Sequence, residues 1–118
     1  MALHNQLGKD AEELAVTYLI EKDYEILYRN WRHSRYEIDI IAKKSELLRI
    51  IEVKALRSST IRYPEESVTK KKFRYLQNAA DEFLFQHPEY RHVQFDILSI
   101  TLHREKEPEF FLIEDVFL

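Results

Sequence analysis

The sequence predicts an α/β fold, and three observations lead to this prediction. A stripe of apolar residues at helical spacing opens the chain, Ile- and Val-rich strand segments follow it, and a second helical stripe precedes a further strand. The resulting order, α-β-β-β-α-β-β, favours a mixed twisted sheet with two principal helices. A length of 118 residues suits a single hydrophobic core, so we expect one domain over residues 1–118.

The first helix is predicted over residues 6–22, because apolar side chains recur there three and four positions apart. Strands are predicted over residues 24–30 and 37–42, which are rich in aromatic and β-branched side chains. Residues 43–47 interrupt this pattern and predict a turn, and residues 48–54 return to it as a third strand. The first helical stripe consists of Leu7, Ala11, Leu14, Ala15, Tyr18 and Leu19.

Residues 57–66 contain Ser, Thr and Pro, which predicts a loop, and Thr69 suits the N-cap of a second helix. Pro88 would end that helix. A strand over residues 93–102 is apolar on both faces, as a central strand should be. After a turn at 105–108, residues 110–113 and 116–118 form a last apolar segment, predicted as a strand. The second helical stripe consists of Phe73, Leu76, Ala79, Ala80, Phe83 and Leu84.

Composition excludes several classes of function. The chain has no Cys, which rules out disulfides and Cys-ligated zinc. A single glycine, Gly8, argues against Gly-rich phosphate loops, and neither H-E-x-x-H nor G-x-S-x-G occurs. No apolar run reaches the roughly 18 residues of a membrane span, and no signal peptide is apparent, so we expect a cytoplasmic protein without a membrane partner.

An acidic pair is predicted on neighbouring strands. If residues 44–47 form the turn, paired residue numbers add to 91, which sets Asp39 opposite Glu52 and Glu37 opposite Lys54. A tighter turn of Ser45 and Glu46 gives the same register, although neither residue favours positive φ. A loop of odd length would separate the two faces.

Two facing carboxylates repel unless a cation lies between them. Oxygen ligands alone favour a hard ion, Mg²⁺ or Mn²⁺. Lys54 beside this ion would either stabilise charge on a phosphate or orient an attacking water, which is the chemistry of phosphodiester hydrolysis. The alternative is that Glu52 and Lys54 are ordinary solvated residues on the polar face of a sheet, since an E-x-K triplet is common.

Together these residues make the sequence resemble the UPF0102 (YraN-like) family and, more broadly, the PD-(D/E)xK, restriction-endonuclease-like nucleases, which include relatives of archaeal Holliday-junction resolvases. The resemblance extends from about residue 7 to residue 100. It implies a restriction-endonuclease-like fold and a nuclease-like domain. The matching segments are Leu7-Gly8 with Glu12 and Ala15, Asn30-Trp31-Arg32, Glu37 to Ala42, Ile51 to Lys54, Val68-Thr69 with Lys72, and Phe95-Asp96-Ile97.

The resemblance also implies roles for individual residues. Asp39 and Glu52 would bind the metal together with the Val53 carbonyl, and Lys54 would be the catalytic lysine. Glu12 would reach the metal through water. Another interpretation of Glu12 is a helix-surface carboxylate near a helix N-terminus, where the helix dipole favours negative charge.

Five positions depart from the family pattern. Ala11 replaces the family's second glycine, a mild change that a helix accommodates. Tyr36 replaces a glycine before Glu37, and Tyr does not easily adopt positive φ. Ala55, Leu56 and Gln94 replace polar residues, so two side chains that could contact a substrate are missing. These departures leave the predicted metal ligands intact and weaken the predicted substrate contacts.

Basic residues near the predicted site favour a nucleic-acid partner, most plausibly DNA. Residues 54–75 hold seven basic and two acidic side chains. Aromatic residues such as Trp31 and Tyr36 would either stack on unpaired bases or belong to the core. The predicted contacts to phosphates are Arg32, Arg35, Arg57 and Lys72.

The leading hypothesis is a Mg²⁺-dependent endonuclease that acts on DNA, with branched or single-strand-containing DNA as the expected substrate. A catalytically silent nucleic-acid-binding or protein-interaction module on the same fold is the alternative, and RNA stays open as a substrate. Cutting a two-fold symmetric junction would require a homodimer.

Overall fold

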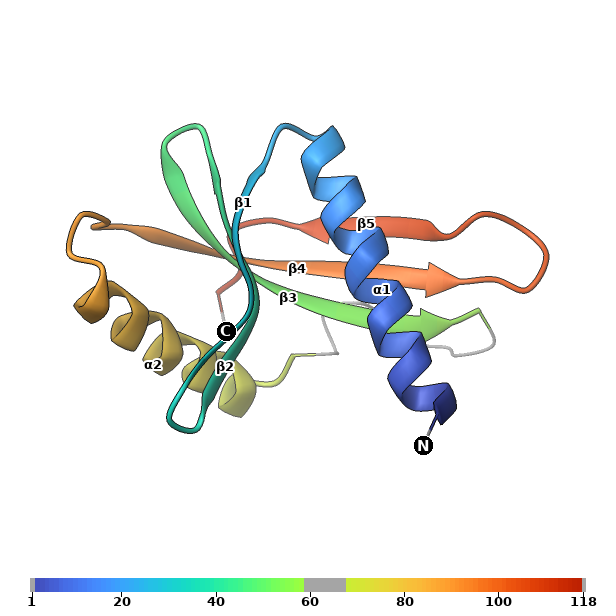
Figure 1. The fold of residues 1–118 in the computed structure, drawn as a ribbon, viewed down its shortest axis with the longest axis horizontal. Coiled ribbons are helices and arrows are strands. Elements are labelled where there is room, and N and C mark those ends of the chain that lie inside the picture. Colours follow the sequence, from blue (N-terminus) through green and yellow to red (C-terminus); the bar gives the residue numbers. More distant parts are fainter. Residues whose placement is uncertain (1, 59–67, 118) are drawn as a thin grey trace.

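The computed structural model describes residues 2–58 and 68–117, with side chains from residue 10 onward. Its elements follow one another in the predicted order, α-β-β-β-α-β-β, so the α/β fold is confirmed (Figure 1). The elements are α1 (Ala2–Glu21), β1 (Glu25–His33), β2 (Tyr36–Lys44), β3 (Leu47–Arg57), α2 (Lys70–Gln86), β4 (Val93–Leu102) and β5 (Glu109–Ile113).

The five strands form one mixed sheet in the order β1-β2-β3-β4-β5. Neighbouring strands are antiparallel except β3 and β4, which are parallel and joined through α2. A parallel pair requires a long crossover, and α2 supplies it. In Figure 1 β1 and β2, at one edge of the sheet, run steeply through the view, with α1 on one side of them and α2 on the other.

The two helices pack against opposite faces of β3, because side chains alternate along a strand. Ala11, Ala15 and Leu19 of α1 belong to a buried cluster with Ile51 of β3. On the other face, Leu48 and Ile50 of β3 pack in a cluster with Ala79, Ala80 and Phe83 of α2. By the same alternation, Glu52 and Lys54 lie on the face of β3 that α2 covers.

Several helices and strands are longer than the sequence predicted. The first helix begins at Ala2 rather than residue 6, and β1 extends to His33 because it pairs with β2 up to the turn. β3 likewise extends to Arg57 because β4 pairs with it along its whole length, whereas β4 has the predicted bounds. Of the predicted loop 57–66, residues 59–66 lie outside the described part.

The second helix starts as predicted. Thr69 is its N-cap, and the Thr69 hydroxyl accepts a hydrogen bond from the Lys72 N–H at 3.1 Å. The helix ends at Gln86, two residues before Pro88. The prediction of a strand at residues 116–118 was wrong for Val116 and Phe117, which follow β5 outside any strand. Leu118 lies outside the described residues.

The register between β2 and β3 is the predicted one. The pairs run from Lys44↔Leu47 to Ile40↔Ile51, and the turn is the tighter alternative, Ser45-Glu46. Both turn residues have positive φ, 53° and 63°. A two-residue hairpin turn requires this conformation, which neither Ser nor Glu adopts readily.

The turn between β1 and β2 explains why a tyrosine is tolerated at position 36. Positive φ occurs at Ser34, at 55°, and not at Tyr36, which pairs with His33 across the turn. The expected difficulty at Tyr36 is therefore absent. In the described ranges, neither helix combines the length and the apolar character needed to cross a membrane.

Candidate functional site

The candidate site lies where β2 separates from β3. Pairing between these strands covers Ile40 to Lys44 of β2, and the first residues of β2 pair only with β1. At this fork the Val53 N–H donates a hydrogen bond to Asp39 Oδ2 at 2.9 Å. The Asp39 carboxylate therefore accepts the hydrogen bond that a backbone carbonyl of a neighbouring strand would otherwise accept.

Two lysines approach Glu52 at the fork. Lys54 Nζ is 3.4 Å and Lys72 Nζ is 3.7 Å from Glu52 Oε2, and the Glu52 side chain is only 6% exposed. Both lysines are about one-third exposed, so their ammonium groups remain accessible from solvent. We call Asp39, Glu52, Lys54 and Lys72 the fork site.

The electrostatics of the fork site favour a bound proton or cation. Burial, and then the negative charge of Glu52, raise the pKa of Asp39 to about 7, against an ordinary value of 3.8. The Val53 hydrogen bond and the positive charge of Lys72 act in the opposite direction and do not cancel the shift. The Asp39 carboxylate therefore binds a proton or a cation more readily at neutral pH than an ordinary aspartate does.

The expected pairing of Glu37 with Lys54 was wrong. Glu37 Oε1 accepts from Arg32 across the β1–β2 hairpin at 3.1 Å, and Lys54 pairs with Glu52 instead. The physical reason is the fork, because β2 has left β3 before it reaches Glu37. Glu37 therefore lies in the hairpin and does not orient Lys54.

Glu12 is not joined to the other candidate ligands. In the described part of the chain, no hydrogen bond or ion pair links it to Asp39 or Glu52. Its neighbour Ala11 belongs to the cluster that contains Ile40 and Ile51, the last pair before the fork. Glu12 Oε1 is buried and, among the described residues, has no hydrogen-bond partner.

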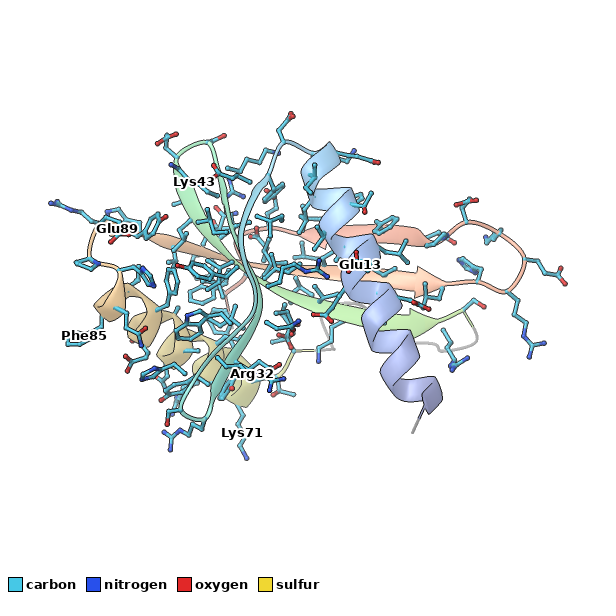
Figure 2. The ribbon with its side chains drawn as sticks, viewed as in Figure 1. Glu13, Arg32, Lys43, Lys71, Phe85 and Glu89 are labelled. Atoms are coloured by element: carbon cyan, nitrogen blue, oxygen red, sulfur yellow. The ribbon has the colours of Figure 1, made fainter. Side chains whose placement is uncertain are left out.

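The three arginines predicted to contact phosphate lie in two places. Arg32 and Arg35 lie at the tip of the β1–β2 hairpin, at the end of the molecule where Figure 2 labels Arg32 and Lys71. Arg57 is exposed at the end of β3.

Trp31 belongs to the core, because it is only 9% exposed and its ring meets Phe83 edge-on with the ring centres 5.5 Å apart.

A cavity of about 290 Å³ opens at the beginning of α2. Its described lining includes Thr69, Lys71, Lys72 and Tyr75. Lys72 therefore joins this cavity to the fork site. Sequence reasoning did not single out Tyr75, although it lies three residues after Lys72 and hence on the same side of the helix.

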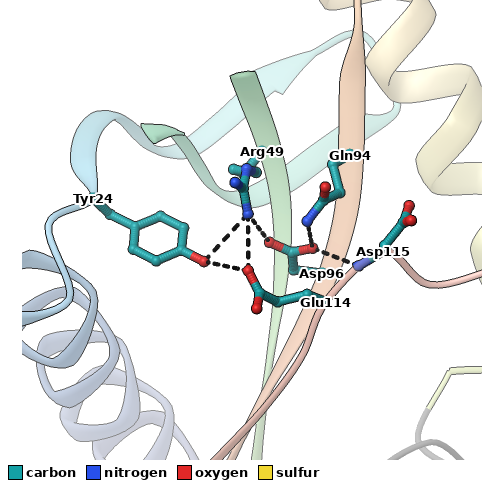
Figure 3. Close-up of polar contacts among 6 residues, drawn as sticks. All are labelled: Tyr24, Arg49, Gln94, Asp96, Glu114 and Asp115. Atoms are coloured by element: carbon teal, nitrogen blue, oxygen red, sulfur yellow. Dashed lines mark hydrogen bonds and ion pairs between the residues drawn. The ribbon is translucent and has the colours of Figure 1, made fainter. Parts of the chain in front are cut away.

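A second acidic cluster lies on the opposite face of β3 (Figure 3). Arg49 Nη1 is 3.0 Å from Glu114 Oε1, 3.6 Å from Asp96 Oδ2 and 3.5 Å from the Tyr24 hydroxyl. We call Tyr24, Arg49, Asp96 and Glu114 the arginine cluster. Burial raises the pKa of Asp96, while its hydrogen bonds and the charge of Arg49 oppose that rise.

The arginine cluster also accounts for two departures from the family pattern. The Gln94 side chain donates to Asp96 Oδ1 at 3.0 Å, so Gln94 supports this cluster. Ala55 packs against the core cluster under α1, on the other face of β3 from Glu52. Neither residue lies where it would contact a substrate at the fork site. Leu56 follows on the Lys54 face and is partly buried.

The residues of the fork site fit a hydrated hard cation. Two carboxylates provide oxygen ligands, and Mg²⁺ commonly binds through one or two carboxylates while it keeps several waters. Over residues 2–58 and 68–117, no group of three or more His, Cys, Asp or Glu side chains could enclose an ion. The donor set thus suits a partly hydrated ion and not a closed protein cage.

The fold and the site define a class of α/β proteins in which the second and third strands of a mixed sheet carry an acidic pair and a lysine. Residues 11–100 match the family model described as "Uncharacterised protein family UPF0102", and the chain belongs to this family. A UPF0102 protein of Phocaeicola vulgatus is 42% identical over 116 residues, covering 98% of this chain and 93% of its own length. A UPF0102 protein of Flavobacterium psychrophilum is 38% identical over 117 residues, covering 99% and 98%.

Proposed function

We propose that this protein is a Mg²⁺- or Mn²⁺-dependent endonuclease of the PD-(D/E)xK type that hydrolyses phosphodiester bonds in DNA. The observation that carries the proposal is the pair of half-buried Asp39 and buried Glu52, flanked by Lys54 and Lys72 at the strand fork. Burial of two like charges is costly unless a cation compensates them. An enzyme that binds a divalent cation between the two carboxylates would offset this cost.

Different side chains of the fork site would have different roles in hydrolysis. Asp39, Glu52 and the Val53 carbonyl would hold the cation, which would lower the pKa of a bound water and polarise the phosphate. The attacking water would lose a proton to solvent as its oxygen forms a new P–O bond, the ester P–O bond would break, and the departing oxygen would take up a proton from solvent. Lys54 would stabilise the charge that develops on the phosphate or orient the attacking water.

Substrate binding would use the basic residues around the fork. Lys72 lies between Glu52 and the cavity, where it would contact a phosphate next to the scissile one. Arg32, Arg35 and Arg57 are exposed and would bind the backbone electrostatically. We expect branched or single-strand-containing DNA as substrate, a cytoplasmic location, and a homodimer if the substrate is a two-fold symmetric junction.

The test is cleavage of labelled duplex, single-stranded, flap and four-way-junction DNA in Mg²⁺, Mn²⁺ or EDTA. We expect cleavage that EDTA abolishes and that Asp39→Asn and Glu52→Gln each reduce at least about a hundredfold. Asp81→Asn, at an exposed position of α2, is the matched control and should cleave like the wild type. Binding without cleavage of any substrate in either metal would contradict the nuclease and favour a binding module.

A further inference from the structure

The Tyr75 hydroxyl joins α2 to the beginning of β2. It accepts a hydrogen bond from the Glu37 N–H at 2.7 Å and donates one to the Arg35 carbonyl at 2.8 Å. These two backbone groups flank Tyr36, where β2 has no pairing with β3. A single side-chain hydroxyl therefore satisfies a donor and an acceptor that a neighbouring strand would otherwise satisfy.

The Tyr75 ring connects the same point to the fork site. Lys72 Nζ lies 4.6 Å from the centre of the ring, and the same ammonium is 3.7 Å from Glu52 Oε2. The Tyr36 ring packs against the Tyr75 ring with their centres 5.5 Å apart. Tyr75 thus contacts both the strand that carries Asp39 and the lysine that approaches Glu52.

The position of Asp39 depends on how the beginning of β2 is held. Asp39 lies just before the last β2–β3 pair, so the β2–β3 ladder does not fix the backbone that precedes it. Its carboxylate must nevertheless stay within hydrogen-bond distance of the Val53 N–H. On the side of the chain before Asp39, β2 is held by its pairing with β1 and by the hydrogen bond from the Glu37 N–H to Tyr75, and the second Tyr75 hydrogen bond ties the turn at Arg35 to α2.

We propose that Tyr75 is a positioning residue for the fork site: it anchors the beginning of β2 to α2 and so keeps the Asp39 carboxylate docked on Val53 beside Glu52. The residue does not touch the reacting atoms. Its effect on metal binding rests on the proposed function, whereas its effect on the docking of Asp39 does not.

The experiment compares Tyr75→Phe with Tyr36→Phe in the full chain. Tyr75→Phe removes the hydroxyl and keeps the ring contacts with Tyr36 and Lys72. Tyr36→Phe is the matched control, because the Tyr36 hydroxyl, among the side chains that the structure describes, has one 3.4 Å contact with the Arg35 guanidinium. Amide hydrogen exchange at Val53 in EDTA reports whether Asp39 is docked. Isothermal calorimetry with Mn²⁺ reports the metal affinity.

We expect Tyr75→Phe to speed Val53 exchange about tenfold and to weaken Mn²⁺ binding by a similar factor, since two hydrogen bonds are lost. Tyr36→Phe should change both quantities less than twofold. Phe83→Leu removes buried apolar contacts under α2 and should lower the melting temperature without changing Mn²⁺ affinity. This variant separates a positioning role of Tyr75 from an effect on general stability.

Exchange at Val53 that is unchanged in Tyr75→Phe would overturn the inference. If the wild type bound no Mn²⁺, the proposed metal site would fail instead, and faster Val53 exchange in Tyr75→Phe would still support the anchoring role. If Val53 exchange rose but Mn²⁺ affinity stayed at the wild-type value, Tyr75 would not position the metal site.

Discussion

The fork site and the arginine cluster lie on opposite faces of β3, and both bury carboxylates. In the arginine cluster, Asp96 has a guanidinium beside it and two hydrogen bonds to one oxygen. In the fork site, Asp39 faces a second carboxylate, and the two lysines form their ion pairs with Glu52. A buried acid with its own cation suits a structural role, whereas a half-buried acid beside a second carboxylate is the arrangement on which the proposed cation site rests.

The largest expected effect is in the arginine cluster. Arg49→Met removes the cation and leaves Asp96 buried, so we expect the free energy of unfolding to fall by about 3–5 kcal/mol at pH 7. Urea unfolding followed by circular dichroism measures this loss. Lys72→Met is the matched control in the fork site and should cost less than about 1 kcal/mol, because the lysine is partly exposed. Equal losses in both variants would contradict the comparison.

The next effect is the pH dependence of stability at the fork site. The folded state raises the pKa of Asp39 from 3.8 to about 7, so its proton is held more tightly than in the unfolded chain. The contribution of Asp39 to the free energy of unfolding is therefore fully present below about pH 4 and is lost as the pH rises through about 7. In EDTA, we expect Asp39→Asn to be more stable than the wild type at pH 8, by at most about 4 kcal/mol at roughly 1.4 kcal/mol per pKa unit.

The difference between Asp39→Asn and the wild type should shrink as the pH falls and vanish near pH 4. Urea unfolding at several pH values measures it, and Asp81→Asn is the control for a general effect of removing negative charge. An Asp39→Asn variant that is less stable than the wild type at pH 8 would mean that Asp39 is a structural acid, like Asp96.

The smallest effect is expected at the rim of the arginine cluster. Glu114 pairs with Arg49 at 3.0 Å, but its side chain is 52% exposed, so solvent screens the interaction. Glu114→Gln keeps the shape and an acceptor, and we expect a loss of about 0.5 kcal/mol, measured by urea unfolding at low salt. A loss as large as that of Arg49→Met would mean that Glu114 and not Asp96 is the main partner of Arg49.

Sequence reasoning was most successful where a short turn determines the structure. An even-numbered turn between β2 and β3 makes the paired residue numbers add to 91, and the pairs from Lys44↔Leu47 to Ile40↔Ile51 follow this register. The ends of elements were less predictable. β3 extends to Arg57 because β4 pairs with it, and a long-range pairing of this kind leaves no local signal.

The same distinction holds for the fork site. The register predicted that Asp39 and Glu52 would be neighbours, yet the point where β2 leaves β3 depends on contacts with α2 that only the folded chain makes. Lys72 was expected to bind phosphate, and its approach to Glu52 results from the packing of the crossover helix. Tyr75 was missed because its role depends on backbone groups in a distant hairpin.

The two-residue turn at Ser45 and Glu46 also bears on the order in which the fork site forms during folding. A tight hairpin closes within microseconds, whereas parallel pairing of β3 with β4 must wait for the whole crossover to be ordered. We therefore expect the hairpin to bring Asp39 and Glu52 near each other first, and the Asp39 carboxylate to dock on Val53 only when α2 brings Tyr75 and Lys72. In the early hairpin the nearby cation is Lys54, which is carried by the same strand as Glu52.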